Sequence, residues 1–462
     1  MQPRVPQPVM GVVERLAAAG HKAFLVGGCV RDALLGRDPV DFDVATSATP
    51  SEVEALFERT APVGAAFGTV LVLSAGMEVH VTTFRADLAY VDGRRPTAVR
   101  FGATVEEDLA RRDFTINAIA WDPLQGAWVD PFGGREDLRR RLIRAVGEPA
   151  ARFREDALRM LRAVRFAAAL DFDVEEATWE GIQAEAEGAR RLSSERVRDE
   201  LMKILAAPDA GRALWMLVAL GLFFIVFPEL KGADRLLQAK RGAPTLLDHS
   251  IQAAARVAGP PLLRLAALFH DVGKLHTRRV AAGGRVVFHG HEKASAEVCR
   301  RAMRRLRFSR AEIERVASLV EMHMALAQPV TKKTLRRWVD RFGEEWVREL
   351  LILGRADAEA SGFGEENPHI DHLEEALREI EAERGAFSRR HLKVDGRDVM
   401  RELGIPPGPL VGAVLEKVYD AVLDDPSLNE RETLLALVRR LSAEEAGRLE
   451  GKADPKPNPR GE

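Results

Sequence analysis

A short stretch near the N-terminus holds five residues whose types and spacing suit phosphate chemistry. Gly27 and Gly28 let backbone N–H groups approach an anion with no Cβ in the way. Arg31 falls in the first turn of the helix predicted to follow, and that helix would present its N-terminus to the same anion. Asp41 and Asp43 are two residues apart in a predicted strand, so their carboxylates share one face of the sheet.

Two carboxylates at this spacing repel each other unless a divalent cation lies between them. Mg²⁺ prefers such oxygen ligands and keeps further coordination positions for phosphate and water. Because the chain has no GxxxxGK[ST] motif, the glycine pair is not a P-loop. The stretch therefore predicts a site that holds a nucleoside triphosphate and two metal ions for in-line phosphoryl transfer. The alternative is a glycine turn beside a solvated acidic strand end.

Strand and helix patterns alternate around these residues. Apolar or alternating runs predict strands at AFLVG, DFDVAT, GTVLVLSA and MEVHVTTFR, and helices are predicted at VRDALLG and SEVEALFERT. From about residue 148 the strand patterns vanish, and the patterns predict successive helices. We therefore expect an α+β fold, in which a mixed-sheet head is followed by helical domains.

Length and composition limit the classes of protein to which the chain can belong. With 462 residues the chain is too long for one core, and 46% hydrophobic with 30% charged residues is typical of a globular protein. A formal net charge of −2 means that any nucleic-acid contact depends on local patches. The low cysteine content suits a reducing cytoplasm, and no signal peptide is expected. The apolar run 213–227 is too short for a membrane span and predicts a buried helix.

Arginine is concentrated in two segments. Ten arginines against five acids lie between Arg135 and Arg165, and six arginines with no acid lie in RRAMRRLRFSR from Arg300. Solvated helix faces explain such runs as well as contact with a polyanion does, so both interpretations stay open.

A stripe of charged residues in EDALRMLRAVRF could recognise a nucleobase. Asp156, Arg159, Arg162 and Arg165 follow one another at steps of three residues on a predicted helix. Aspartate accepts hydrogen bonds and arginine donates them. Adenine and cytosine present an amino group beside an unprotonated ring nitrogen, whereas guanine and uracil present a carbonyl beside a ring N–H. A buried Asp–Arg pair would therefore accept A and C and refuse G and U, and an ordinary amphipathic helix is the alternative.

A second set of residues has the types of a transition-metal site. Its members lie on predicted helices and are His249, His270, Asp271, His291, His323 and Asp357. Neutral imidazoles and carboxylates suit divalent transition metals. Because single histidines are more often structural, the hypothesis depends on the whole set.

The motif GGCVRD followed by DFD resembles the DNA polymerase β nucleotidyltransferase superfamily. More narrowly, the chain resembles the bacterial class II tRNA nucleotidyltransferases, the CCA-adding enzymes, with bacterial poly(A) polymerases as close kin. The resemblance covers most of residues 20–205 and continues through GTVLVLSAGMEVHVTTFR, VDGRRPTAVRF, EEDLARRDFTINAIAWDP, DPFGG, RFREDALRMLRAVRFA and ERVRDELMKIL. It implies a polymerase-β-like head, then helical neck, body and tail, in a Mg²⁺-dependent enzyme that acts on tRNA, CTP and ATP.

The resemblance also implies roles for individual residues. The implied Mg²⁺ ligands are Asp41 and Asp43. The implied nucleotide contacts, among which the pair 156 and 159 would recognise the base, are Gly27, Gly28, Arg31, Arg112, Asp156, Arg159, Arg162 and Arg165. Superfamily members often carry a third carboxylate on a neighbouring strand. Here His80 stands before VTTFR and Glu78 two residues earlier, and whether either acts as a third group stays open.

The histidine–aspartate set, with its motif HDVGK, resembles the HD metal-dependent phosphohydrolase superfamily over about residues 245–360. This resemblance implies phosphatase or cyclic-phosphodiesterase activity on RNA ends, with Mn²⁺, Ni²⁺ or Co²⁺ as the metal. Together the resemblances predict a head at 1–147, a neck at 148–240, an HD domain at 241–365, a C-terminal helical domain at 366–449 and a disordered tail at 450–462.

The leading interpretation is a cytoplasmic enzyme, with no membrane segment, that adds CCA to tRNA 3′ ends by two-metal nucleotidyl transfer. Close alternatives are a poly(A) polymerase, or an enzyme that adds only A or only CC. A different class is an RNA-binding HD phosphohydrolase with an inactive head. The choice between C and A would come from the growing RNA end and head movement, with Val91 to Pro96 as the predicted lever. The oligomeric state stays open.

Overall fold

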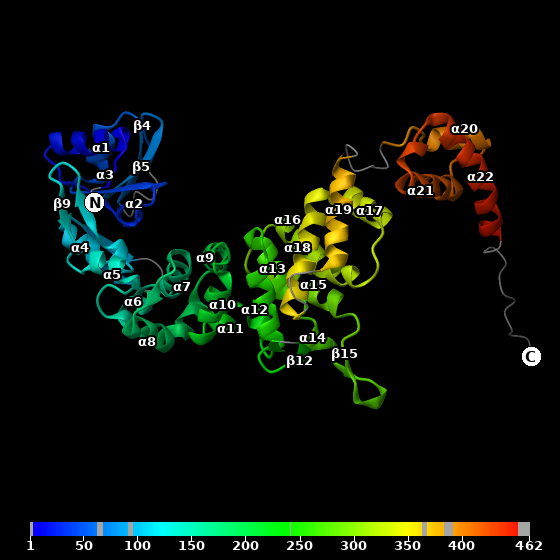
Figure 1. Ribbon diagram of the computed structural model, residues 1–462. Helices are drawn as coiled ribbons and strands as arrows, with labels where there is room; N and C mark the ends of the chain where they lie inside the picture. Colours follow the sequence, from blue (N-terminus) through cyan, green and yellow to red (C-terminus); the bar gives the residue numbers. More distant parts are fainter. Residues whose placement is uncertain are drawn as a thin grey trace, which may run out of the picture.

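The computed structural model describes residues 3–61, 68–90, 96–240, 242–362, 367–382 and 391–450. Residues 91–95 of the predicted lever, and the tail from residue 451 for which we expect disorder, lie outside these ranges. Within them the chain runs from a mixed α/β head through a series of helices to a C-terminal helical unit (Figure 1). The expected α+β fold is therefore confirmed, while the exact domain boundaries stay a prediction.

A seven-stranded mixed sheet forms the centre of the head. Its order is β3-β4-β5-β2-β1-β8-β9, in which β2 and β5 are parallel and the other neighbours are antiparallel. Val12 and Leu16 of helix α1 (Gln7–Ala18) are buried in one core with Val44 and Val79, so α1 covers one face. The strands are β1 (Ala23–Val26), β2 (Phe42–Thr46), β3 (Thr60–Ala61), β4 (Thr69–Ser74), β5 (Met77–Thr83), β8 (Ala120–Asp122) and β9 (Ala127–Val129).

A smaller core on the other face of the sheet contains Val26, Ala45, Phe84 and Leu109. Side chains alternate along a strand, so neighbouring residues of β2 enter different cores. The remaining elements of the head are α2 (Gly28–Leu34), α3 (Pro50–Leu56), β6 (Arg85–Tyr90), β7 (Pro96–Phe101), α4 (Val105–Ala110), the 3₁₀ turn η2 (Thr115–Asn117), α5 (Gly134–Arg140) and β10 (Leu142–Ile143).

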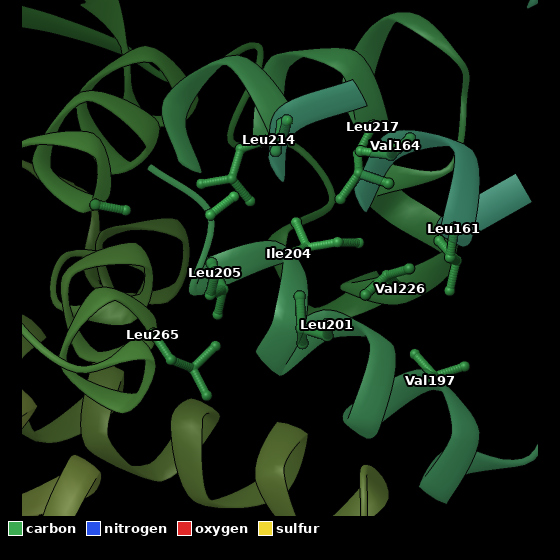
Figure 2. Packing of buried hydrophobic residues seen from close by; sticks show 14 of the residues in the cluster. Leu161, Val164, Val197, Leu201, Ile204, Leu205, Leu214, Leu217, Val226 and Leu265 are labelled. Carbon is green, nitrogen blue, oxygen red and sulfur yellow. The ribbon is translucent and has the colours of Figure 1, made fainter. Parts of the chain in front are cut away.

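The neck is a helical layer with a continuous apolar core. Helices α7 (Leu158–Leu170), α9 (Ser194–Leu205) and α10 (Ala210–Ala219) bury their leucines and valines against one another, and Leu265 of α13 (Pro261–Phe269) joins them (Figure 2). The other neck elements are α6 (Pro149–Glu155), β11 (Asp173–Val174), α8 (Glu176–Glu185) and α11 (Phe223–Val226). This core fixes α7 and α9 relative to each other.

The apolar run 213–227 is not the single buried helix that we predicted. It is divided between α10 and α11 at Gly221, whose φ of 75° cannot continue an α-helix. Its residues are largely buried, as expected. Among the described residues, no helix has both the length and the apolar character needed to cross a membrane.

The expectation of purely helical structure after the head was wrong at β11, which pairs in parallel with β10 of the head, and at two hairpins. Strands β12 (Leu237–Lys240) and β13 (Ala243–Thr245) form one antiparallel pair, and β14 (Arg279–Val280) and β15 (Val286–Val287) form another. Strands of two to four residues are too short to show an alternating pattern in the sequence.

The rest of the described chain is helical. The helices that follow the neck are α12 (Leu246–Arg256), α13, α14 (Lys274–Thr277), α15 (His291–Arg305), α16 (Arg310–Met322), α17 (Lys332–Phe342), α18 (Glu344–Ala360) and α19 (Pro368–Ala382), with the 3₁₀ turn η6 (His323–Ala327) between α16 and α17. A separate core holds the C-terminal helices together, and these are α20 (Gly396–Leu403), α21 (Pro409–Asp424) and α22 (Arg431–Glu450).

Candidate functional site

A cavity of about 580 Å³ lies where the head meets the neck. Every residue predicted to hold Mg²⁺ or the nucleotide lines this cavity, and these residues come from both the head and the neck. The lining residues are Gly27, Gly28, Arg31, Asp41, Asp43, Arg111, Arg112, Asp113, Asn117, Asp156, Leu158, Arg159, Arg162, Arg165, Phe166 and Arg196. The sequence-based hypotheses about the head and the charged stripe therefore concern one and the same cavity.

The turn at Gly27 brings the backbone close to two charged groups. Gly27 has a φ of 74°, and a Cβ at this position would lie 2.9 Å from Nη1 of Arg112 and 3.6 Å from Oδ2 of Asp43. The positive φ favours glycine, and a Cβ here would also displace the guanidinium of Arg112. The following residue, Gly28, begins helix α2 and also lines the cavity.

Asp43 lies at the centre of the sheet edge that faces the cavity. It pairs with Val26 of β1 on one side and with His80 of β5 on the other. Asp41 is exposed and directly precedes β2, so it is outside the strand in which we predicted it. Burial raises the pKa of Asp43, and the nearby Asp41 adds to the rise although Arg112 and His80 oppose it. A charged carboxylate here is thus unfavourable without a further cation.

The open question of a third group near the aspartates has a geometric answer. Nδ1 of His80 lies 3.7 Å from Oδ1 of Asp43, directly across the strand pair. Glu78 is exposed and pairs with Leu73 of β4. Of the two candidates, His80 is therefore the one that contacts a predicted metal ligand.

A chain of polar side chains connects the neck to the head through Asp113. Nε of Arg162 donates to Oδ2 of Asp113 at 2.7 Å, and Nδ2 of Asn117 donates to Oδ1 at 3.0 Å. Oδ1 of Asn117 in turn accepts a 2.9 Å hydrogen bond from Nη1 of Arg31. Burial would raise the pKa of Asp113, but Arg162, Asn117 and the N–H of Phe114 outweigh it and lower the pKa to about 2.

Asp156 and Arg159 both line the cavity, but Asp156 is not on the helix on which we predicted it. Helix α7 begins at Leu158, and Asp156 is extended backbone between α6 and α7. Oδ1 of Asp156 accepts a hydrogen bond from the N–H of Leu158 at 3.1 Å, and Oδ2 accepts one from Nη2 of Arg196 at 2.7 Å. The partner of Asp156 is therefore Arg196, which comes from α9.

Arg159 is held by three other groups. Nη1 donates to Oε2 of Glu155 at 2.8 Å and to the carbonyl of Arg152 at 3.2 Å, and Nη2 donates to the carbonyl of Arg111 at 2.9 Å. These contacts bury Arg159, which is only 7% exposed, and fix its guanidinium at the cavity wall.

The remaining members of the stripe are engaged in ion pairs. Arg162 binds Asp113, and Arg165 binds Glu200 of α9 while its guanidinium stacks 4.0 Å from the ring centre of Phe166. The three arginines of the stripe are therefore anchored separately, each by its own acidic partner.

The cavity carries an excess of positive charge, with seven arginines against four aspartates along its wall. Two of its buried donors, Nε of Arg112 and Nη1 of Arg196, have no hydrogen-bond partner among the described residues. Buried donors without partners are unfavourable, so these two atoms indicate a ligand that supplies acceptors. A nucleotide with a charged phosphate chain has this chemistry.

Sequence reasoning missed several residues of this site. Asp113 and Asn117 lie in RRDFTINA, and Arg196 lies in ERVRDELMKIL, so the motifs that carried the resemblance contain them. Their burial and their partners arise from contacts between distant segments, which the sequence pattern does not show.

The six residues of the histidine–aspartate set also meet in space. They come from α12, the end of α13, α15, η6 and α18, and they include His249 and His270, whose Nε2 atoms are 3.1 Å apart. Oδ2 of Asp271 lies 3.5 Å and 3.4 Å from these two nitrogens, and Oδ1 of Asp357 lies 3.0 Å and 3.5 Å from them. The predicted convergence of the set is thus observed.

The same Asp271 faces a second pair of histidines through its other oxygen. Oδ1 of Asp271 lies 3.2 Å from Nε2 of His291 and 3.7 Å from Nε2 of His323. Donor atoms therefore form two groups that share this carboxylate. We call the six residues the histidine–aspartate cluster.

Backbone carbonyls orient three of the four imidazoles. Nδ1 of His270, His291 and His323 each donates to the carbonyl three residues earlier, at 2.7, 2.9 and 2.7 Å. In the neutral form of each ring this leaves Nε2 without a proton and directed at the cluster, the arrangement that metal-binding histidines require. Nε2 of His291 and of His323 is buried without a hydrogen-bond partner among the described residues.

The electrostatics of the cluster also fit a cation. Burial lowers the pKa of His270, but Asp271 and Asp357 outweigh it and raise the pKa to about 9. Burial lowers the pKa of His323 to about 4, which keeps this imidazole neutral. The buried carboxylate of Asp271 and the half-buried carboxylate of Asp357 thus favour positive charge beside them, and the neutral imidazole of His323 can serve as a ligand.

Comparisons with known proteins agree with the geometry of the head. Residues 23–144 match the poly A polymerase head domain, and residues 171–233 match the probable RNA and SrmB-binding site of polymerase A. Residues 287–438 match tRNA nucleotidyltransferase domain 2 and span parts of the predicted HD and C-terminal domains. The first two matched regions thus correspond to the head and to part of the neck, which are the two parts of the chain that line the cavity.

Relatives along the whole chain identify the family. The CCA-adding enzyme of Streptococcus gordonii is 36% identical over 433 residues, which cover 94% of this chain and 97% of that one. The CCA-adding enzyme of Geobacillus stearothermophilus is 36% identical, with 93% and 96% covered. The crystal structure of the Bacillus stearothermophilus CCA-adding enzyme in complex with CTP superposes with a TM-score of 0.71, at 31% identity, and covers 97% of this chain and 99% of that one.

These full-length relatives favour CCA addition over the poly(A), A-only and CC-only alternatives, and over a chain with an inactive head. The mixed sheet, the paired aspartates and the arginine-lined cavity are consistent with that activity. The chain therefore belongs to the family of CCA-adding enzymes and is a template-independent nucleotidyltransferase.

Proposed function

We propose that the cavity between head and neck extends the 3′ end of tRNA with CTP and ATP, with Mg²⁺ held by Asp41 and Asp43. The observation that carries this proposal is that one cavity contains both carboxylates, the Gly27 turn and seven arginines. The similar enzyme from Bacillus stearothermophilus, crystallised with CTP, supports the choice of nucleotide.

The residues present fit a divalent metal, which CCA-adding enzymes generally require. Asp41 and Asp43 would hold it, because burial disfavours the charge of Asp43 until a cation lies beside it. When bound, Mg²⁺ stabilises the charge that develops on the phosphate and favours the deprotonated 3′-hydroxyl of the RNA. That 3′-oxygen bonds to the α-phosphorus while the bond from the α-phosphorus to pyrophosphate breaks.

The protein's own groups position the triphosphate. The Gly27 turn leaves room for phosphate oxygens beside Arg112, whose buried Nε has no partner among the described residues. Asn117 holds the guanidinium of Arg31 at the same wall. Fixed cations of this kind stabilise the transition state without reorganising during the reaction.

Asp156 and Arg159 are the proposed readers of the base. Each carboxylate oxygen of Asp156 has one hydrogen-bond donor from the protein, so it can accept a second one from the amino group of cytosine or adenine. The anchored guanidinium of Arg159 would donate to the neighbouring ring nitrogen. Guanine and uracil would place a carbonyl against Asp156 and an N–H against Arg159, which leaves buried groups unpaired.

A specific observation favours a second activity, which is metal-dependent phosphohydrolysis at the histidine–aspartate cluster. Six predicted ligands converge there, backbone carbonyls orient three of their imidazoles, and that of His323 is neutral. Mn²⁺, Ni²⁺ or Co²⁺ suits this donor set and would activate water for attack on phosphorus. With a 2′,3′-cyclic phosphate, water adds to phosphorus and one ring P–O bond breaks, which gives a monoester and a free hydroxyl.

Removal of either proposed Mg²⁺ ligand should abolish nucleotide transfer. In Asp41→Ala or Asp43→Ala we expect a loss of about 10³-fold or more, because metal stabilisation of phosphoryl transfer amounts to several kcal/mol. The measurement is incorporation of each labelled NTP into tRNA that lacks its CCA end. Asp38→Ala, at an exposed aspartate three residues earlier, is the control and should be near normal. Near-normal incorporation by either soluble ligand variant would disprove the assignment.

A side chain at Gly27 should reduce CTP binding and nucleotide transfer more than it reduces thermal stability. Gly27→Ala forces an unfavourable φ and moves Arg112, so we expect both weaker CTP binding and slower transfer. Gly36→Ala is a matched control, because Gly36 has a φ of 72° and a Cβ there would meet no other group within 4 Å. Both variants should lose similar thermal stability, and equal losses of CTP affinity would contradict the proposed role of the turn.

Loss of the proposed donor to the base should reduce the selectivity for CTP and ATP over GTP and UTP. For Arg159→Ala we expect discrimination against GTP and UTP to fall about tenfold or more, since a base contact is worth about 1–3 kcal/mol, while part of the transfer rate remains. The measurement is the ratio of kcat/KM for CTP and UTP. Glu155→Gln weakens one anchor of Arg159 but keeps the guanidinium, so it should keep most of the selectivity. Unchanged ratios in Arg159→Ala would exclude it as a reader.

The second activity should be separable from the first. His270→Ala removes one ligand of the cluster, so it should eliminate phosphate release from 2′-nucleotides and ring opening of 2′,3′-cyclic phosphates while sparing nucleotide addition. His276→Ala, at an exposed histidine of α14, is the control. If the wild-type enzyme neither releases phosphate nor opens the cyclic phosphate with Mn²⁺, Ni²⁺ or Co²⁺, the cluster has a structural role.

A further inference from the structure

A second cavity, of about 810 Å³, lies between the two hairpins that the sequence did not predict. Its wall includes Arg235, Gln238, Arg278, Arg285 and Phe288, from β12, the loop before it, and both sides of the β14–β15 hairpin. Strands β12 and β15 lie beside α14 at the same edge of the molecule (Figure 1). We call this cavity the hairpin groove.

The hairpin groove is positively charged. Arg278 and Arg285 are exposed, and neither has an ion pair within the part of the chain that the structure describes. Arg235 has only Asp234, at 3.8 Å, and its side chain is 88% exposed. No acidic residue occurs among the described residues of the wall. The groove therefore favours an anionic ligand.

The groove also offers apolar surface beside these cations. The half-buried ring of Phe288 lines it, and so do Leu237 and Val286, which are 75% and 40% exposed. Nucleobases stack on such surface while arginines contact the phosphates, and this combination is typical of sites for single-stranded nucleic acid. An inorganic anion alone would leave the apolar part of the wall unused.

Two groove residues connect the groove to the histidine–aspartate cluster. Nζ of Lys274 donates to Oε1 of Gln238 at 3.2 Å and to Oδ2 of Asp271 at 2.5 Å. The carbonyl of Phe288 accepts the hydrogen bond from Nδ1 of His291 at 2.9 Å. A ligand in the groove would therefore lie next to the cluster, with the ammonium group of Lys274 between Gln238 and Asp271.

Gln238 adds an unused donor to this wall. Its Nε2 is buried and has no partner among the described residues, while its Oε1 is occupied by Lys274. A base or phosphate oxygen in the groove would supply the missing acceptor.

We propose that the hairpin groove binds the unpaired nucleotides next to the phosphorylated RNA end that the cluster hydrolyses. This inference rests on the proposed phosphohydrolase activity and makes its substrate an RNA end rather than a free mononucleotide.

The test compares two substrates that carry the same 2′,3′-cyclic phosphate but differ in length. A hexaribonucleotide with a 2′,3′-cyclic phosphate can occupy the groove, whereas a 2′,3′-cyclic mononucleotide has no further nucleotides to place there. For the double variant Arg278→Ala/Arg285→Ala we expect the ratio of KM for the hexanucleotide to KM for the mononucleotide to rise about tenfold or more, since each lost base stack or phosphate contact is worth about that factor. Arg279→Ala is the matched control, because this exposed arginine is on β14 but outside the groove.

An unchanged ratio in the double variant, or an equal rise in Arg279→Ala, would overturn the proposal. Retained CCA addition by each variant shows that the chain is folded. Crosslinking of a 4-thiouridine hexanucleotide to the full-length protein gives a readout that needs no hydrolysis. Crosslinks in the peptide that contains Phe288 support the groove, and loss of them in Phe288→Leu is expected. Crosslinks only elsewhere refute it, whereas absence of hydrolysis with crosslinks at Phe288 would refute the phosphohydrolase alone.

Discussion

The buried carboxylate of Asp113 is the point on which the nucleotide site depends. It accepts hydrogen bonds from Asn117 in the head and from Arg162 in neck helix α7, so one charged group fixes the two walls of the cavity relative to each other. Arg31 is held through Asn117. Breaking such a buried, hydrogen-bonded pair costs several kcal/mol, because the remaining charge has no solvent. Since the pKa of Asp113 is lowered from 3.8 to about 2, this stabilisation is complete above pH 3.8 and is lost as the pH falls towards 2.

Both sites keep buried polar atoms for a ligand. In the cavity these are donors, Nε of Arg112 and Nη1 of Arg196, and in the cluster they are the acceptors Nε2 of His291 and His323. A folded chain that leaves such atoms without partners is destabilised unless something binds them. The charge of the ligand that these atoms require therefore differs between the two sites. The cavity requires an anion with acceptor atoms, and the cluster requires cations.

How far the sequence could predict these sites depends on the range of the interactions. The Gly27 turn and the aspartates near β2 are local features of one strand–turn–helix segment, and their spacing alone predicted their meeting. The six cluster residues were predicted as a set because metal ligands are recognisable by type and order. The hydrogen-bond partner of Asp156 was not predicted, for the opposite reason. Whether Asp156 meets Arg159 or Arg196 depends on where α7 begins and on how α9 packs against it, and neither follows from a step of three residues.

The proposed reading of the base by Asp156 depends on the packing of the neck, because Arg196 of α9 binds this carboxylate. Arg196 stands at the start of α9, and α9 is held against α7 and α10 by the apolar core that contains Leu201 and Ile204 (Figure 2). A shift of α9 would move the guanidinium that orients Asp156, even though Leu201 and Ile204 are not among the described residues that line the cavity. The metal ligands depend instead on the pairing of β2 with β1 and β5. The head sheet and the neck share one core, which contains Val44 and Val79 as well as Leu201 and Ile204. This core supports both the proposed base reader and the proposed metal ligands, and the hydrogen bond between Arg162 and Asp113 links the two walls of the cavity.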